Sequence, residues 1–114
     1  MRIIPFDQVV DTVAKLAVET NNRLPQDVLD RLIAMRREET GPLAISILDQ
    51  IIANAGIAAE CGLPLCQDTG VSVVFAELGE NVRVDGGLDA AVNEGVRNGY
   101  REGGLRNSMV SDPL

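Results

Sequence analysis

Residues 40–64 read TGPLAISILDQIIANAGIAAECGLP. The stretch predicts one long helix, because Pro42 suits the first turn of a helix and the apolar residues after it cover more than one helical face. Gly62 and Pro64 follow the run, and both are residues that commonly end a helix. Polar residues interrupt the run at positions 46, 49, 50 and 54, so we expect a helix buried in the protein core and not one that spans a membrane.

Two amphipathic helices are expected before this one. Asp7 is a suitable cap for the first, whose apolar residues recur at helical spacing until about Asn22. Pro25 suits the start of the second, and Asp27 lies near the positive end of its dipole. Apolar residues at positions 28, 29, 32 and 33 continue the second helix to about Glu39.

The sequence after residue 70 changes to a strand pattern. Residues 71–78 are rich in β-branched side chains, and a turn at residues 79–81 before a second run at residues 82–84 predicts a β-hairpin. Helical spacing returns over residues 88–102, and Gly103-Gly104 ends it. The predicted fold class is therefore α+β: mostly helical, with three helices, then a β-hairpin, then a helix.

Composition is that of a folded chain of one domain's size. It has 114 residues, of which 46% are hydrophobic and 24% charged. A net charge of -7 and an aromatic content of 3% argue against a nucleic-acid partner, which needs a basic surface and rings for stacking. No export signal follows Met1, and two cysteines make no disulfide framework, so we expect a cytoplasmic protein with reduced or metal-bound thiols.

Residues 64–70, PLCQDTG, carry a dense set of reactive side chains. A thiol, an amide, a carboxylate and a hydroxyl follow one another between a helix and an expected strand, where loops often present functional groups. An ordinary turn is the alternative, since Asp-Thr-Gly is good turn chemistry and a cysteine beside a helix is often only a small apolar residue. The chain has no histidine, which argues against catalytic triads and, with two cysteines, against a zinc site within this chain.

Residues 64–70 resemble the Cys-Gln-Asp-Thr-Gly signature of the oxygen-sensitive, class I fumarate hydratases and the related L-tartrate dehydratase alpha subunits. Residues 104–114, GLRNSMVSDPL, look like the second signature of that family, around a substrate-binding arginine. Two motifs in the family's order favour a functional loop over an ordinary turn. The resemblance covers essentially the whole chain. It implies that residues 1–114 are a single amino-terminal fragment of a larger iron-sulfur hydro-lyase alpha domain, and the end at Leu114 reads as a cut.

The resemblance also assigns roles to individual residues. In that family three cysteines hold a [4Fe-4S] cluster whose fourth iron binds substrate as a Lewis acid; Cys66 matches one of these metal ligands, and the other two lie beyond residue 114. Gln67 and Asp68 match substrate-binding positions, and Asp68 is also the expected catalytic residue, orienting the hydroxyl group or taking part in proton transfer. Arg106 matches the arginine that binds a substrate carboxylate. Cys61 falls on no signature position, so a structural role is expected for it.

The resemblance implies a fumarate hydratase, a hydro-lyase of the citric acid cycle that reversibly hydrates fumarate to L-malate. Its implied partners are a small dicarboxylate, the rest of the alpha domain, and a beta domain or subunit, in a homodimer without nucleic acid or membrane; this chain alone would be inactive. An L-tartrate dehydratase alpha-subunit fragment is the alternative within the same chemistry. A non-catalytic assembly module is the alternative from another class. A thiol switch between Cys61 and Cys66 is disfavoured, because the chain has no C-x-x-C motif.

Overall fold

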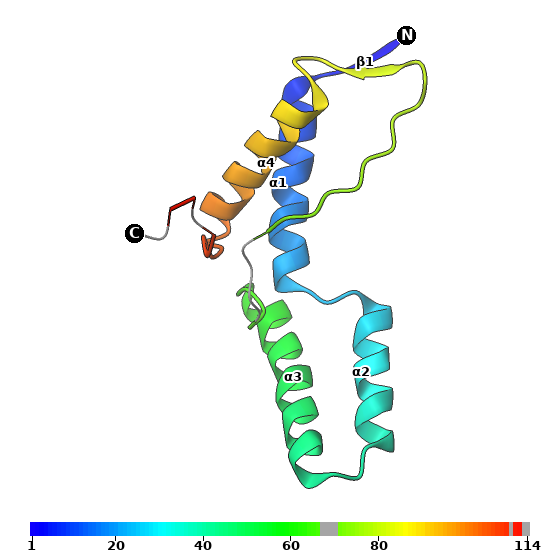
Figure 1. Ribbon diagram of the computed structural model, residues 1–114, viewed down its shortest axis with the longest axis vertical. Helices are drawn as coiled ribbons and strands as arrows, with labels where there is room; N and C mark the ends of the chain where they lie inside the picture. The colour runs from blue at the N-terminus through cyan, green and yellow to red at the C-terminus, as the bar shows by residue number, and fades with distance from the viewer. Residues whose placement is uncertain (67–70, 110, 113–114) are drawn as a thin grey trace. The chain divides into compact units, whose positions relative to one another are not determined.

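The computed structural model describes residues 1–66, 71–109 and 111–112 (Figure 1). The described residues form, in chain order, β1 (Arg2–Ile4), α1 (Phe6–Asn22), α2 (Gln26–Glu38), α3 (Pro42–Cys61), β2 (Val82–Val84) and α4 (Leu88–Glu102). The chain divides into two compact units. The strand unit comprises residues 1–19 and 68–114, and the helical unit comprises residues 20–67. The expected order of helices is confirmed, and the fold is mostly helical.

The two strands form a parallel pair and not the hairpin expected from the sequence. β1 pairs with β2 so that Arg2 lies opposite Val82 and Ile4 opposite Val84. The strand at residues 82–84 is confirmed, but residues 71–78 form no strand, and Phe75 within them is 94% exposed. The β-branched residues of that segment favour an extended backbone, yet β propensity does not choose the partner. The partner here is a three-residue strand at the amino terminus, too short to register as a pattern.

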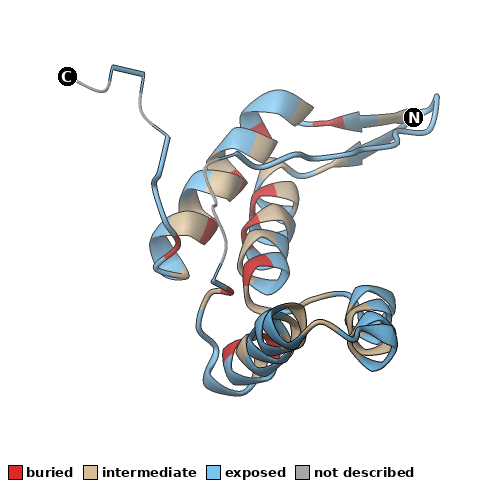
Figure 2. Cartoon of the chain, turned by 60° about the horizontal axis from the view of Figure 1, so that its bottom comes forward, coloured by how far each residue is buried: buried red, intermediate tan, exposed pale blue. Residues whose placement is uncertain are grey.

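Small residues let α1 and α4 approach each other closely in the strand unit. The cluster of buried residues here consists of Val10, Val84 and Ala91, with apolar side chains of both helices packed around it. A Cβ added at Gly95 of α4 would lie 2.6 Å from the Cβ of Val13, and one added at Gly99 would lie 2.6 Å from the carbonyl oxygen of Ala14. Figure 2 marks the buried residues along both helices. The spacing of the glycines, four residues apart, therefore sets how the end of α4 is held on α1.

The helical unit is a pair of helices, α2 and α3, that lie side by side (Figure 1). Its buried cluster is Ala55, Ala58 and Leu65, with Leu24 and Leu29 packed against it. Nε of Arg36 on α2 donates a hydrogen bond to Oδ1 of Asp49 on α3 at 2.6 Å, and Nη2 donates to Oδ2 at 3.2 Å.

Contrary to the sequence prediction, α3 is not buried in this structure. Only two of its residues are buried, Ala55 and Ala58, because α2 and the loop after α3 cover one side of it. Leu43 is 75% exposed, and Ile47 and Ile51, one and two turns further along the same face, are also exposed. Within the described residues, α3 is the one helix that is long and apolar enough, by length and composition alone, to cross a membrane. Its polar residues therefore do not exclude a membrane span, contrary to the expectation from the sequence.

Candidate functional site

The loop that carries Cys66 begins at a helix end fixed by a glycine. Gly62 has a φ of 65°, the left-handed conformation that glycine adopts without steric strain. The backbone N–H of Leu63 donates to the carbonyl oxygen of Ala58 at 3.2 Å, and Nδ2 of Asn22 donates to the carbonyl oxygen of Gly62 at 3.3 Å. These bonds direct the chain back along the helical unit immediately after α3.

Two further contacts hold the backbone at Cys66. Leu65 is 6% exposed, in the same cluster as Ala55 and Ala58, and its N–H donates to the carbonyl oxygen of Asn21 at 2.7 Å. The N–H of Cys66 itself donates to Oδ1 of Asn54 on α3 at 3.0 Å. A buried side chain on one residue and a backbone hydrogen bond on the next keep the position of Cys66 defined while its side chain remains exposed.

The thiol of Cys66 fits the part of a single cluster ligand. It is free and exposed, and so is the thiol of Cys61 at the last residue of α3. Among the described residues, no group of three or more His, Cys, Asp or Glu side chains is arranged to hold a metal ion. A cluster of four irons requires more thiolates than one, so the described part of the chain fits one ligand position and not a whole set.

The remaining residues of the first motif, Gln67 and Asp68 with Thr69 and Gly70, lie outside the described residues. Their expected roles in substrate binding and proton transfer stay predictions. Cys66 belongs to the helical unit, and Arg106 belongs to the strand unit.

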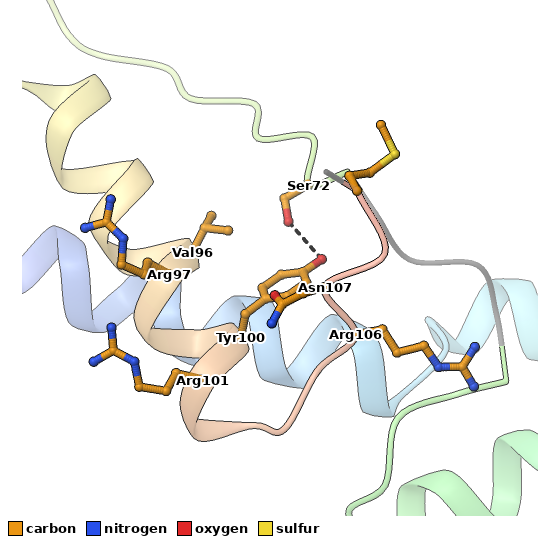
Figure 3. A pocket seen from close by; sticks show the side chains of 8 residues that line it. Ser72, Val96, Arg97, Tyr100, Arg101, Arg106 and Asn107 are labelled. Atoms are coloured by element: carbon orange, nitrogen blue, oxygen red, sulfur yellow. Dashed lines mark hydrogen bonds between the residues drawn. The ribbon is translucent and has the colours of Figure 1, made fainter. Parts of the chain in front are cut away.

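Arg106 borders a pocket of about 390 Å3 in the strand unit (Figure 3). The pocket lies at the end of α4 and gathers basic, hydroxyl and amide side chains from three segments of that unit: Ser72, Val96, Arg97, Tyr100, Arg101, Arg106, Asn107 and Met109. Arg106 itself is exposed. Guanidinium, amide and hydroxyl groups are the donors that bind carboxylates, so the pocket suits a small anionic ligand.

The guanidinium groups around the pocket do not converge on one point. In Figure 3, Arg97 and Arg101 lie on one side of Tyr100 and Asn107, and Arg106 lies on the other. Arg97 also forms an ion pair with Glu94, one turn earlier on α4. A carboxylate bound by Arg106 would therefore lie on the opposite side of the pocket from Arg97 and Arg101.

Hydrogen bonds of Tyr100 join the three segments that meet in this pocket. Oγ of Ser72 donates to the hydroxyl oxygen of Tyr100 at 3.2 Å. The carbonyl oxygen of Tyr100 accepts from the N–H of Leu105 at 3.0 Å, and Leu105 is buried immediately before Arg106. Ser72 is the second residue after the first motif, and Arg106 is the arginine of the second. A residue just after the first motif and a residue of the second motif thus line the same pocket.

Sequence reasoning did not identify Asn54, Ser72 or Tyr100 as part of the site. Asn54 counted only as an interruption of an apolar helix, Ser72 as part of a strand, and Tyr100 as an apolar residue of the last helix. Each acts through a partner that is distant along the chain, so helical or strand spacing carries no signal for it. The tyrosine hydroxyl was the one available hint, because a partly buried hydroxyl needs a hydrogen-bond partner.

Comparison with known protein families shows which family the chain belongs to. A family model described as fumarate hydratase (Fumerase) matches residues 10–114. The chain belongs to the fumarate hydratase family. The family that residues 64–70 and 104–114 suggested is therefore confirmed.

Relatives within the fumarate hydratase family carry two kinds of name. A candidate L(+)-tartrate dehydratase subunit alpha of Methanocaldococcus jannaschii is 34% identical over 105 residues, which is 90% of this chain and 37% of the relative. The L(+)-tartrate dehydratase subunit alpha of Escherichia coli K12 is 26% identical over 91% of this chain and 34% of its own length. The aerobic class I fumarate hydratase of Escherichia coli K12 is 44% identical over 60 residues, 53% of this chain and 11% of its own length.

Proposed function

We propose that this chain supplies part of a hydro-lyase that reversibly hydrates fumarate to L-malate with a [4Fe-4S] cluster. The observation that carries the proposal is Cys66, an exposed thiol on a loop held by Leu65 and Asn54, at the start of a Cys-Gln-Asp-Thr-Gly sequence in a member of the fumarate hydratase family. The chain spans 37% or less of the relatives described above, so the activity is assigned to the complete protein and not to these residues alone.

Each residue of the proposed site has a chemical task that suits its side chain. Cys66 holds the cluster as one of its thiolate ligands. When bound, the cluster supplies a Lewis-acidic iron for the hydroxyl group that is added or removed. Arg106 binds a substrate carboxylate through its planar guanidinium group, and Gln67 also contacts the substrate. Asp68 orients the hydroxyl group or moves the proton, as a positioned carboxylate does in general acid–base catalysis.

The test is anaerobic reconstitution of the complete protein, with its beta domain or subunit, using wild type, Cys66→Ser and Cys61→Ser. We expect wild type to bind the cluster and hydrate fumarate, and Cys66→Ser to lose both. Cys61→Ser is the matched control, a second exposed thiol five residues away, and we expect it to keep both properties. Retention of cluster and activity by Cys66→Ser would show that the ligand assignment is wrong.

L-tartrate is the second candidate substrate. The two relatives named as tartrate dehydratase alpha subunits match 90% and 91% of this chain, whereas the fumarate hydratase matches 53%. The ratio of kcat/KM for L-malate and L-tartrate dehydration by the complete enzyme decides between the two. If kcat/KM for L-tartrate exceeds that for L-malate by more than about tenfold, L-tartrate replaces fumarate and L-malate as the proposed substrate.

The assembly is also part of the proposal. The alpha-subunit names of two relatives support a beta partner for the complete protein. We propose in addition that the complete protein is a homodimeric enzyme of the cytoplasm. A non-catalytic assembly role for the chain by itself rests on the exposed apolar residues of α3. Fumarate turnover by the isolated 114 residues would contradict that role.

A further inference from the structure

Tyr100 occupies a central place in the pocket beside Arg106 (Figure 3). Its hydroxyl oxygen accepts a hydrogen bond from Ser72, and its carbonyl oxygen accepts one from the N–H of Leu105. One residue therefore binds, through two different atoms, the segment that follows the first motif and the segment that carries the arginine of the second.

The backbone that supports Tyr100 is closely packed. Gly99 is buried, and a Cβ added there would lie 2.6 Å from the carbonyl oxygen of Ala14 and 2.9 Å from the Cβ of Ala17 on α1. A Cβ added at Gly103 would lie 2.8 Å from Cγ2 of Val18. The last turn of α4 is thus held against α1, and a side chain on such a support has few alternative positions.

We propose that Tyr100 is a positioning residue that sets Arg106 for binding a substrate carboxylate, with the Ser72–Tyr100 hydrogen bond fixing the two sides of the pocket. This inference rests on the proposed hydro-lyase function and adds two residues, Ser72 and Tyr100, to the substrate site. Without the bond, the segment at Ser72 separates from α4 and the ligand must order the pocket when it binds. Affinity falls accordingly, because a preorganised site avoids that ordering penalty.

A positioning role and a purely structural role have different kinetic signatures. A carboxylate is bound equally in the substrate and in the transition state, so loosening its site raises KM and leaves kcat unchanged. A loss of stability alone reduces the fraction of folded enzyme, which lowers the apparent kcat and leaves KM unchanged. The expected rise in KM is about two- to tenfold, the worth of one net hydrogen bond.

The experiment uses the complete hydro-lyase with Tyr100→Phe, Ser72→Ala, and the two combined. We expect each single variant to raise KM for L-malate about two- to tenfold with little change in kcat, and the combined variant to match either single one, because all three remove the same bond. Thr12→Val is the matched control, since the Thr12 hydroxyl donates to the carbonyl oxygen of Gln8 on the same helix and Thr12 does not line the pocket, and it should keep the wild-type KM.

Failure of this inference differs from failure of the proposed function. If wild type turns over neither L-malate nor L-tartrate, the hydro-lyase function is wrong and the inference falls with it. If wild type is active but Tyr100→Phe keeps the wild-type KM, or the single effects add in the combined variant, only the positioning role is overturned.

The Ser72–Tyr100 hydrogen bond can also be tested without an activity measurement. Tyr100 is the only tyrosine and the chain has no tryptophan, so tyrosine fluorescence of the 114-residue chain reports on Tyr100 alone. We expect Ser72→Ala to change the fluorescence intensity and Thr12→Val to leave it as in wild type. An unchanged intensity in Ser72→Ala would overturn the proposal.

Discussion

Gly95 lies where α4 meets α1, and its missing side chain is a requirement of the packing. A Cβ at this position would stand 2.6 Å from the Cβ of Val13 and 2.8 Å from the carbonyl oxygen of Val10. We expect Gly95→Ala to lower the free energy of unfolding by about 1–3 kcal/mol, because the helices must move apart to admit the methyl group. Chemical denaturation of the purified chain measures the change.

Gly56 is the control for this prediction, since it also lies inside a helix. A Cβ added there meets no atom within 4 Å. Gly56→Ala should therefore leave stability unchanged or raise it by about 0.5–1 kcal/mol, the ordinary difference between the two residues in a helix. Equal effects of the two alanines would mean that the α1–α4 approach is looser than the structure indicates.

Asn54 is the residue through which α3 holds Cys66. Its Oδ1 accepts the N–H of Cys66 at 3.0 Å. We expect Asn54→Ala to weaken cluster binding in the complete protein about tenfold, comparable to losses at residues that orient a metal ligand. Asn54→Asp keeps an acceptor of the same shape and should retain most of the binding. Iron content measured against iron added distinguishes the two variants, and equal binding by both would contradict this role of Asn54.

At the scale of elements, the helical unit has two carboxylates with lowered pKa values, one that joins α2 to α3 and one in the turn between them. The guanidinium of Arg36 holds the pKa of Asp49 below its ordinary value, and Asp49 in turn raises the pKa of Arg36. The backbone N–H groups of Gly41 and Thr40 likewise lower the pKa of Glu39 just before α3. A carboxyl group with a lowered folded pKa stabilises the fold above its unfolded pKa, near 4, and that contribution is lost as pH falls through the folded pKa.

Asp49→Asn tests this dependence. We expect the thermal midpoint of wild type to exceed that of Asp49→Asn at pH 7, and the difference to shrink toward zero as the pH falls through the lowered pKa of Asp49, below the ordinary value near 4. The pair is exposed, so added salt should shrink the difference as well. Arg36→Gln removes the same pair and should show the same pH dependence in circular dichroism melts. A difference that stays constant with pH would mean that the ion pair contributes nothing.

At the scale of the whole molecule, the sequence predicts features that depend on neighbouring residues better than features that depend on distant ones. Helix ends were predictable, because Pro42 and Gly62 act on their own backbone. The parallel pairing of β1 with β2 was not predictable, because the partner of β2 is chosen by contacts across most of the chain. The resemblance to the family's two motifs indicated Cys66 and Arg106, but the pocket at Arg106 depends on Ser72 and Tyr100, which are 28 residues apart. Burial of α3 was predicted wrongly, because apolar composition does not say which residues of this chain cover it.

The exposed face of α3 governs how the isolated chain behaves in solution. Leu43, Ile47 and Ile51 follow one another at single-turn spacing and are exposed. A row of apolar side chains on this scale favours association, so we expect the weight-average mass of the chain to rise with concentration in sedimentation experiments. Ile47→Glu should shift this self-association to concentrations about tenfold higher, since one buried isoleucine side chain is lost from each contact. Ala53→Glu adds the same charge about 120° round the helix and should behave as wild type. An equal shift in both variants would attribute the association to net charge and not to this face.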